Sequence, residues 1–144
     1  MDFSKYAQKG NEFLVEVSKE LGSDYTTKGA GRIVRSVLHV LRDLLSVEES
    51  LQLVSQLPMA LKSVYVDGWT THKPTKRIRH MGDFVTAVVL EDGDAGYNDF
   101  AAKKNGLNTI EVVFKVLNRH VSRGEMLDIK SVLPPELKPL CDVK

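Results

Sequence analysis

The sequence has one cysteine, almost no net charge and no long apolar run, and each shortage excludes a class of protein. Cys141 has no second cysteine to pair with, so we expect no internal disulfide and a reducing, cytoplasmic location. The chain has twenty basic and nineteen acidic residues, and a net charge of +1 does not steer it toward nucleic acid or acidic lipid. No apolar run approaches the ~18 residues that span a bilayer, so we expect no membrane association. The N-terminal residues carry no secretory signal.

The rest of the composition is that of a folded soluble protein. Of the 144 residues, 42% are hydrophobic and 27% are charged. A chain of this length buries roughly two thirds of its unfolded surface, so it needs neither a disulfide nor a metal to fold.

The chain contains an internal repeat. Residues 29–62 align without a gap to residues 105–138, and 11 of the 34 pairs are identical, where average composition would give roughly two. The identical pairs are Val37/Val113, Val40/Val116, Leu41/Leu117, Ser46/Ser122, Glu49/Glu125, Leu51/Leu127, Ser55/Ser131, Leu57/Leu133, Pro58/Pro134, Leu61/Leu137 and Lys62/Lys138. Equivalent residues lie 76 positions apart in this alignment and 71 positions apart in the first helix of each half. The second copy therefore has five extra residues, in the stretch 90–105. One supersecondary unit is therefore used twice.

Apolar residues three, four and seven apart predict amphipathic helices in both halves. The first helix ends at Gly22, and because Gly10 costs ~1 kcal/mol in a helix, we expect it to begin near Asn11. Its apolar stripe is Phe3, Tyr6, Phe13, Leu14, Val17 and Leu21. The second helix of each half carries Ile33, Val37, Leu41, Leu44 and Leu45, or Ile110, Val113, Phe114, Leu117 and Val121.

Two S-x-x-E capping boxes, at residues 46–49 and 122–125, predict where the third helix of each half begins. Leu51, Val54 and Leu57 are expected on one apolar face, echoed by Leu127 and Leu133. Pro58 and Pro134 end these helices and open short fourth helices over Met59–Val66 and Pro135–Cys141.

These patterns predict an all-α protein of two pseudo-symmetric repeats with about four helices each, packed as one compact bundle. The whole chain, residues 1–144, is expected to form a single domain. Its repeats cover about residues 3–69 and 80–141, and a basic connector, residues 70–79, joins them.

The stretch Gln56-Leu57-Pro58-Met59-Ala60-Leu61-Lys62 through Gly68-Trp69, with its echo Val132-Leu133-Pro134-Pro135-Glu136-Leu137, resembles domain-of-unknown-function family 2267. The similarity runs from about Asn11 to Leu140. The resemblance implies a bacterial protein with a tandem all-helical repeat. It implies no catalytic residue, because the family has no established activity. The stretch Leu90–Asn105 departs from the family's usual short connection.

The sequence indicates no catalytic, cofactor or metal site. The histidines lack metal-ligand spacing and are interpreted as surface or capping residues, including His39 and His120. Cys141 lies near a helix end where no N-terminal dipole would lower its pKa. Gly29-Ala30-Gly31-Arg32 lacks the strand and the third glycine of a dinucleotide fingerprint, so it is interpreted as the start of a helix.

The basic connector is the one candidate binding feature. Lys73, Lys76, Arg77 and Arg79 could meet an anion or a partner, and Trp69 could stack a base. The favoured role of Trp69 is to pack the first half against the second. The leading hypothesis is a non-enzymatic interaction module that binds another protein, or a second copy of itself, through a helical face or groove. The alternatives are nucleic-acid or anionic-ligand binding through the connector, the less favoured partner class, and an enzyme or carrier with a cavity between the halves.

Overall fold

The computed structural model describes residues 1–70, 77–101 and 106–144, and every regular element in these ranges is helical. The predicted all-α class is therefore confirmed. The α-helices are α1 (Ser4–Leu21), α2 (Thr27–Leu44), α3 (Val47–Val54), α4 (Met59–Val66), α5 (Met81–Glu91), α6 (Gly106–His120) and α7 (Arg123–Val132). The shorter helices are η1 (Gly93–Ala95), the π-helical η2 (Tyr97–Ala101) and the 3-10 helix η3 (Pro135–Asp142).

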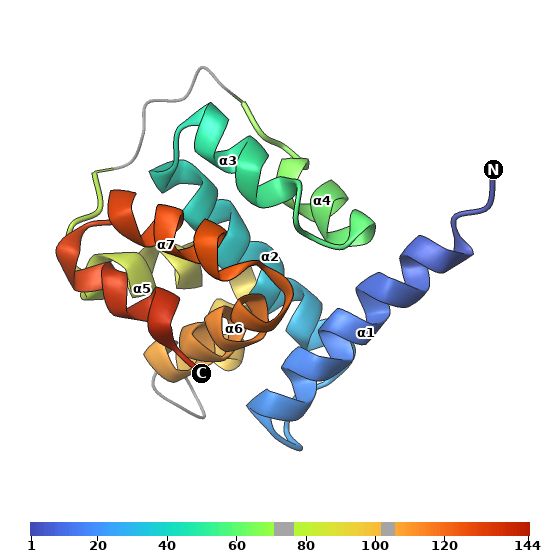
Figure 1. The fold of residues 1–144 in the computed structure, drawn as a ribbon. Helices are drawn as coiled ribbons and strands as arrows, with labels where there is room; N and C mark the ends of the chain where they lie inside the picture. Colours follow the sequence, from blue (N-terminus) through green and yellow to red (C-terminus); the bar gives the residue numbers. More distant parts are fainter. Residues whose placement is uncertain (71–76, 102–105) are drawn as a thin grey trace.

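Helices α2 and α6 form the centre of the molecule, and the other helices pack around them (Figure 1). α2 touches α1, α4, α5 and α6, and α6 also touches α1, α5 and η3. Their inward faces carry fully buried side chains such as Ile33, Leu38, Ile110 and Phe114. The two halves of the sequence therefore share one continuous hydrophobic core.

The predicted third and fourth helices begin where the sequence places them. Ser46 and Ser122 cap α3 and α7 by accepting hydrogen bonds from the backbone N–H three residues later. Pro58 and Pro134 precede α4 and η3 as their N-caps, one position earlier than a proline at N1. The last helix is 3-10 rather than α-helical, and it contains Pro139, which has no backbone N–H to donate.

Equivalent positions of the third helix are buried alike in the two halves over six residues. Residues 50–55 and 126–131 agree position by position as buried, exposed, exposed, buried, half-buried and exposed. The predicted pseudo-symmetric relation between the two packets of helices stays a prediction.

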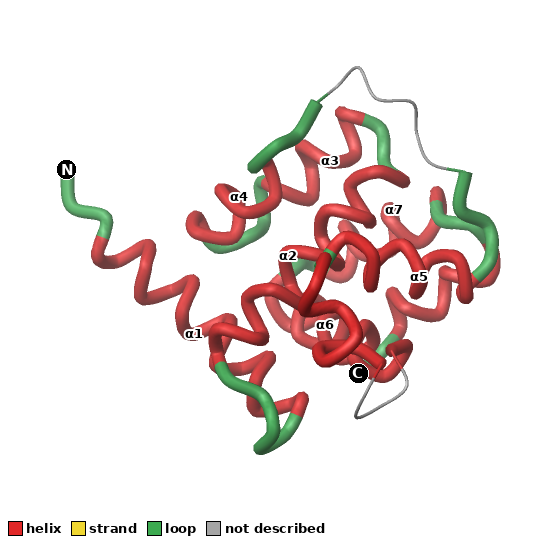
Figure 2. The backbone as a smooth tube through the Cα atoms, turned by 180° about the vertical axis from the view of Figure 1, so that it is seen from behind, coloured by secondary structure: helices red, strands yellow, loops and turns green. Residues whose placement is uncertain are grey.

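Helix α1 corrects the expectation that the first helix begins near Asn11. It begins at Ser4 and runs through Gly10, which lies buried where α1 crosses α4. A Cβ atom on Gly10 would lie 2.5 Å from the Ala60 Cβ, so the absent side chain permits the close approach of the two helices. The N-terminal end of α1 extends beyond the rest of the molecule (Figures 1 and 2), so Phe3 and Tyr6 lie outside the core.

The apolar face predicted for the third helices is also wrong in part. Leu51 is 55% exposed and Leu127 is 44% exposed. The buried side of α3 carries Ser50 and Leu53 instead. Ser50 is tolerated there because its hydroxyl bonds the buried Tyr65 hydroxyl at 2.7 Å.

Part of the stretch with the extra residues folds onto the first half. Within residues 93–101, Phe100 is fully buried and the Asp99 side chain reaches Arg32 on α2. Residues 102–105 lie outside the described part of the chain.

Candidate protein-interaction surfaces

The structure describes part of the predicted basic connector. Arg77 and Arg79 are exposed on either side of the buried Ile78 and form no ion pair among the described residues. With Val132–Pro135 they line a groove of about 540 Å³. Lys73 and Lys76 lie outside the described residues.

Trp69 does not belong to that groove. Its half-buried ring meets Tyr65 edge-on, with ring centroids 6.1 Å apart. Both aromatic residues belong to the first half, so this contact packs the segment after α4 onto α4 itself. Burial raises the pKa of the Tyr65 hydroxyl to about 12, and its hydrogen bond to Ser50 only partly offsets that effect. The role of Trp69 between the halves stays a prediction.

The expectation that the histidines lie at the surface is wrong for His39, which is 3% exposed. Its Nε2 donates to the Val64 carbonyl at 2.7 Å, and its Nδ1 lies 3.4 Å from a Glu91 carboxylate oxygen. The ring therefore ties α2 to α4 and α5. His120 instead bonds Glu16 at 3.0 Å on the molecular surface.

A half-buried charged cluster joins α2 to the segment after α5. Arg32 donates two hydrogen bonds to the Asp99 carboxylate, at 2.9 and 3.0 Å, which is the bidentate geometry of strong Arg–carboxylate pairs. Burial opposes ionisation of Asp99, but the hydrogen bonds from Arg32 and Asp92 outweigh it and lower its pKa. Burial, together with the neighbouring Asp99 carboxylate, raises the pKa of Asp92 to about 7. The Arg32 guanidinium is thus committed to a partner within the chain.

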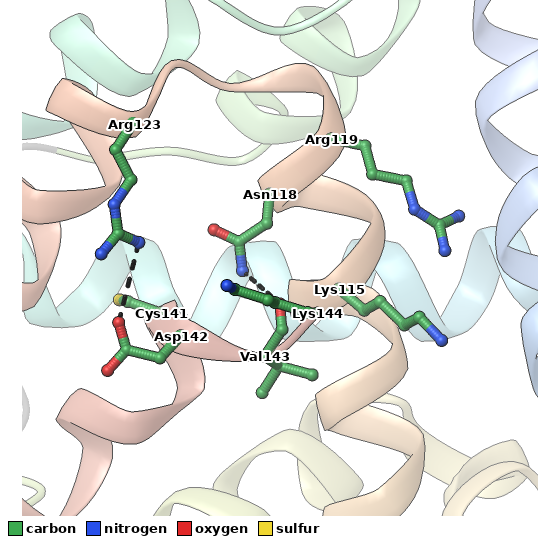
Figure 3. A pocket seen from close by; sticks show the side chains of 8 residues that line it. All are labelled: Lys115, Asn118, Arg119, Arg123, Cys141, Asp142, Val143 and Lys144. Atoms are coloured by element: carbon green, nitrogen blue, oxygen red, sulfur yellow. Dashed lines mark hydrogen bonds and ion pairs between the residues drawn. The ribbon is translucent and has the colours of Figure 1, made fainter.

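A second polar site surrounds the lone cysteine (Figure 3). Cys141 lies in a pocket of about 290 Å³, and burial raises the pKa of its thiol to about 11, so it is unsuited to thiolate chemistry. Three of the cations around it are engaged: Arg123 lies 3.8 Å from Asp142, and Lys115 and Arg119 bond carboxylates on α1. The described residues hold no group of three or more His, Cys, Asp or Glu side chains suited to a metal ion.

Exposed apolar side chains lie on α3 and α7, which run side by side in opposite directions (Figure 1). We call this surface the α3–α7 face and define it by Val47, Glu48 and Leu51 of α3 and Leu127 and Asp128 of α7. All five side chains are exposed. Glu48 and Asp128 form no ion pair among the described residues, so the face combines three apolar side chains with two free carboxylates.

The α3–α7 face contains the one identical Leu or Val pair of the internal repeat that is exposed rather than buried. Six Leu or Val pairs are identical between the halves, and in five of them both members are at most 4% exposed. Leu51 and Leu127 form the sixth pair, and both are exposed. Core packing accounts for the other five pairs and does not account for this one.

A groove between the projecting end of α1 and the start of α4 is the second apolar surface. We call it the α1–α4 groove. It holds about 470 Å³ and is lined by Lys5, Tyr6, Lys9, Glu12, Gln56, Leu57, Pro58, Met59, Lys62 and His120. Tyr6 and Met59 are 38% and 47% exposed. Lys5 and Lys62 form no ion pair among the described residues, whereas Lys9 lies 3.8 Å from Glu12. The lining of the groove therefore combines apolar side chains with two lysines that have no ion-pair partner among the described residues.

Comparison with known proteins places the chain in a family. Residues 10–140 match the family described as uncharacterized conserved protein DUF2267. The chain belongs to DUF2267. No curated protein matches this DUF2267 chain. In the described part of the chain, no helix combines the length and the hydropathy of a membrane span.

The residues that carried the DUF2267 resemblance hold the α3–α4 turn in place. The Gln56 side chain accepts a hydrogen bond from the Ser122 backbone N–H at 2.7 Å, which joins the first half to the start of α7. The Glu125 side chain does not accept a hydrogen bond from that N–H. The predicted capping box of the second half therefore has only one of its two bonds, from the Glu125 backbone N–H to the Ser122 hydroxyl. Leu57 enters the core, and Pro58 caps α4.

Neither apolar surface is predicted by the sequence. The spacing of Leu51, Leu127 and Tyr6 fits a helical stripe and therefore predicts core positions for all three. The groove also combines residues from two segments distant in sequence, and no local pattern indicates such a site. A signal was present for the α3–α7 face, because a second stripe, through Ser50, Leu53 and Leu57, competes with the one through Leu51.

Proposed function

We propose that this protein is a non-enzymatic protein-interaction module of the cytoplasm, and that the α3–α7 face is its binding surface. The observation that supports the proposal is the exposure of Leu51 and Leu127 at equivalent positions of the two halves. Exposed leucines cost solubility and add nothing to the core, so a contact with a partner gives both a role.

The chemistry of the face agrees with binding to protein. Val47 and Leu51 are one helical turn apart, which is the spacing at which a helix presents anchors to a groove. The described residues offer no activated thiol beside this face, because Cys141 is buried and its burial raises the pKa of the thiol to about 11. The proposal therefore needs only apolar burial and charge pairing.

Site-specific photo-crosslinking in the native host tests this proposal. A photoreactive residue at Leu51 or Leu127 is expected to give the same protein adduct, because both positions belong to one face. Leu90 is the matched control, since it is 74% exposed and lies outside the face. Absence of an adduct from positions 51 and 127, or the same adduct from position 90, would contradict the proposal.

The second candidate function is binding of a nucleic acid or another anionic ligand through the connector. The free Arg77 and Arg79 side chains beside the Val132–Pro135 groove favour it. Retention on heparin at low salt, lost when Lys76, Arg77 and Arg79 become alanine, is the expected result. A protein that flows through heparin at low salt rejects this candidate.

A further inference from the structure

We propose that the partner of the α3–α7 face is a second copy of this chain, which receives that face in its α1–α4 groove. This inference rests on the proposed function, because it names the partner of the same face. It also assigns a role to the groove, which the proposed function leaves unused.

The two surfaces are complementary in charge. The α3–α7 face carries Glu48 and Asp128, and the lining of the α1–α4 groove includes Lys5 and Lys62. None of these four side chains has an ion-pair partner among the described residues, so each is available to pair across an interface. Opposite free charges on two surfaces orient an encounter and favour one register of docking.

The two surfaces are also complementary in polarity. The face projects Val47, Leu51 and Leu127, and the lining of the groove includes the partly exposed Tyr6 and Met59. A helix that lays an apolar face into a groove buries such side chains together. Each set is exposed in a single copy, so association would remove both from water at once.

The two surfaces lie next to each other on one molecule. α3 carries the face and ends at the turn, Ser55–Pro58, that leads into the groove, so the two surfaces adjoin on one molecule. Two copies that exchange these contacts reciprocally form a twofold dimer, and copies that make one contact each form a chain. Both outcomes contain the same pairing of face with groove.

Charge reversal on the full chain tests the inference. One variant, Glu48→Lys/Asp128→Lys, makes the face basic, and the other, Lys5→Glu/Lys62→Glu, makes the groove acidic. Sedimentation velocity between about 1 and about 200 µM covers the range in which micromolar contacts are populated. We expect the wild type to exceed its monomer mass of 16.1 kDa as concentration rises. Each variant alone should associate at least about tenfold more weakly, since like charges then face one another.

An equimolar mixture of the two variants is the decisive sample. Each reversed surface then meets a surface of opposite charge, so association is expected to return. The control variant is Lys19→Glu/Lys28→Glu, which changes the net charge by the same amount as Lys5→Glu/Lys62→Glu but at exposed positions outside the groove. It should associate as the wild type does. A circular-dichroism melt of each variant shows whether it is folded.

The outcomes separate this inference from the proposed function. A wild type that stays monomeric over the whole range, or a mixture that does not recover, overturns the pairing of the face with the groove of a second copy. The crosslinking at positions 51 and 127 still decides the proposed function in that event, because an adduct with a different protein supports it. Adducts of twice the chain mass support both.

Discussion

Asp92 keeps its proton at a pH where an exposed aspartate has lost it. Its pKa lies near 7 because the side chain is removed from water and faces the Asp99 carboxylate, and Arg32 and Ser36 offset only part of this effect. One oxygen of Asp92 is buried without a hydrogen-bond partner, so the charged form is poorly solvated.

The sign of the pH effect follows from the raised pKa. Between the ordinary value of 3.8 and about 7 the folded chain binds more protons at Asp92 than the unfolded chain does. The contribution of Asp92 to stability therefore falls as pH rises through this window and is constant above it. Asp92→Asn keeps the shape of the side chain and removes the charge, so it should unfold at higher urea than the wild type at about pH 8 and at similar urea at about pH 4.

Urea unfolding of Asp92→Asn and wild type at both pH values checks this prediction. Asp94→Asn, in the same segment, is the control, because Asp94 is exposed and belongs to no ion pair among the described residues. Equal stabilisation by Asp92→Asn at both pH values would mean that ionisation of Asp92 is not the cause.

At the scale of elements, the α1–α4 crossing depends on the lack of a side chain at one position. Gly10→Ala should raise helix propensity by ~1 kcal/mol, yet its methyl group would clash with Ala60. We expect the clash to prevail and the variant to lose about 1–3 kcal/mol of unfolding free energy, as overpacked cores do.

Two companions make the Gly10 prediction specific. Gly82→Ala, on α5, meets no atom within 4 Å and should leave stability unchanged or slightly higher. Ala60→Gly in the Gly10→Ala background frees the space and should restore part of the loss. A Gly10→Ala protein as stable as the wild type in urea would show that the helices separate at little cost.

Sequence analysis located most of the helices because caps, prolines and apolar spacing agree there. The fourth helix was predicted over Met59–Val66 and is found over the same residues, since Pro58 fixes its start. The start of α1 was misplaced because the cost of Gly10 is local, whereas the contact with Ala60 that stabilises the helix is tertiary. The face of α3 was misassigned because a serine is buried there through one hydrogen bond to Tyr65.

At the scale of the whole molecule, Gln56 links the two halves through one hydrogen bond to the start of α7. Gln56→Ala leaves the Ser122 N–H without that acceptor, so we expect the free energy of unfolding to fall by ~1 kcal/mol. Gln52→Ala, one turn earlier and exposed, should have no measurable effect. Urea denaturation of the two variants tests this, and equal stability of both would assign no role to the bond.

The candidate surfaces could be foreseen less well than the helices. Arg77 and Arg79 were expected to be accessible and they are, because an extended segment between helices has few neighbours. The α1–α4 groove depends on how far α1 projects past α4, and that distance is set by the crossing at Gly10 rather than by any motif.

The labelling rate of the lone thiol reports how often the C-terminal part of this protein opens locally. Cys141 is 1% exposed, so a thiol reagent reaches it only when η3 lifts from α6 and α7. With an excess of reagent at fixed pH, the rate of Cys141 labelling would measure how often η3 opens. Each molecule reacts once, and no probe has to be introduced. Strain or a bound partner near the C-terminal helices would change this labelling rate.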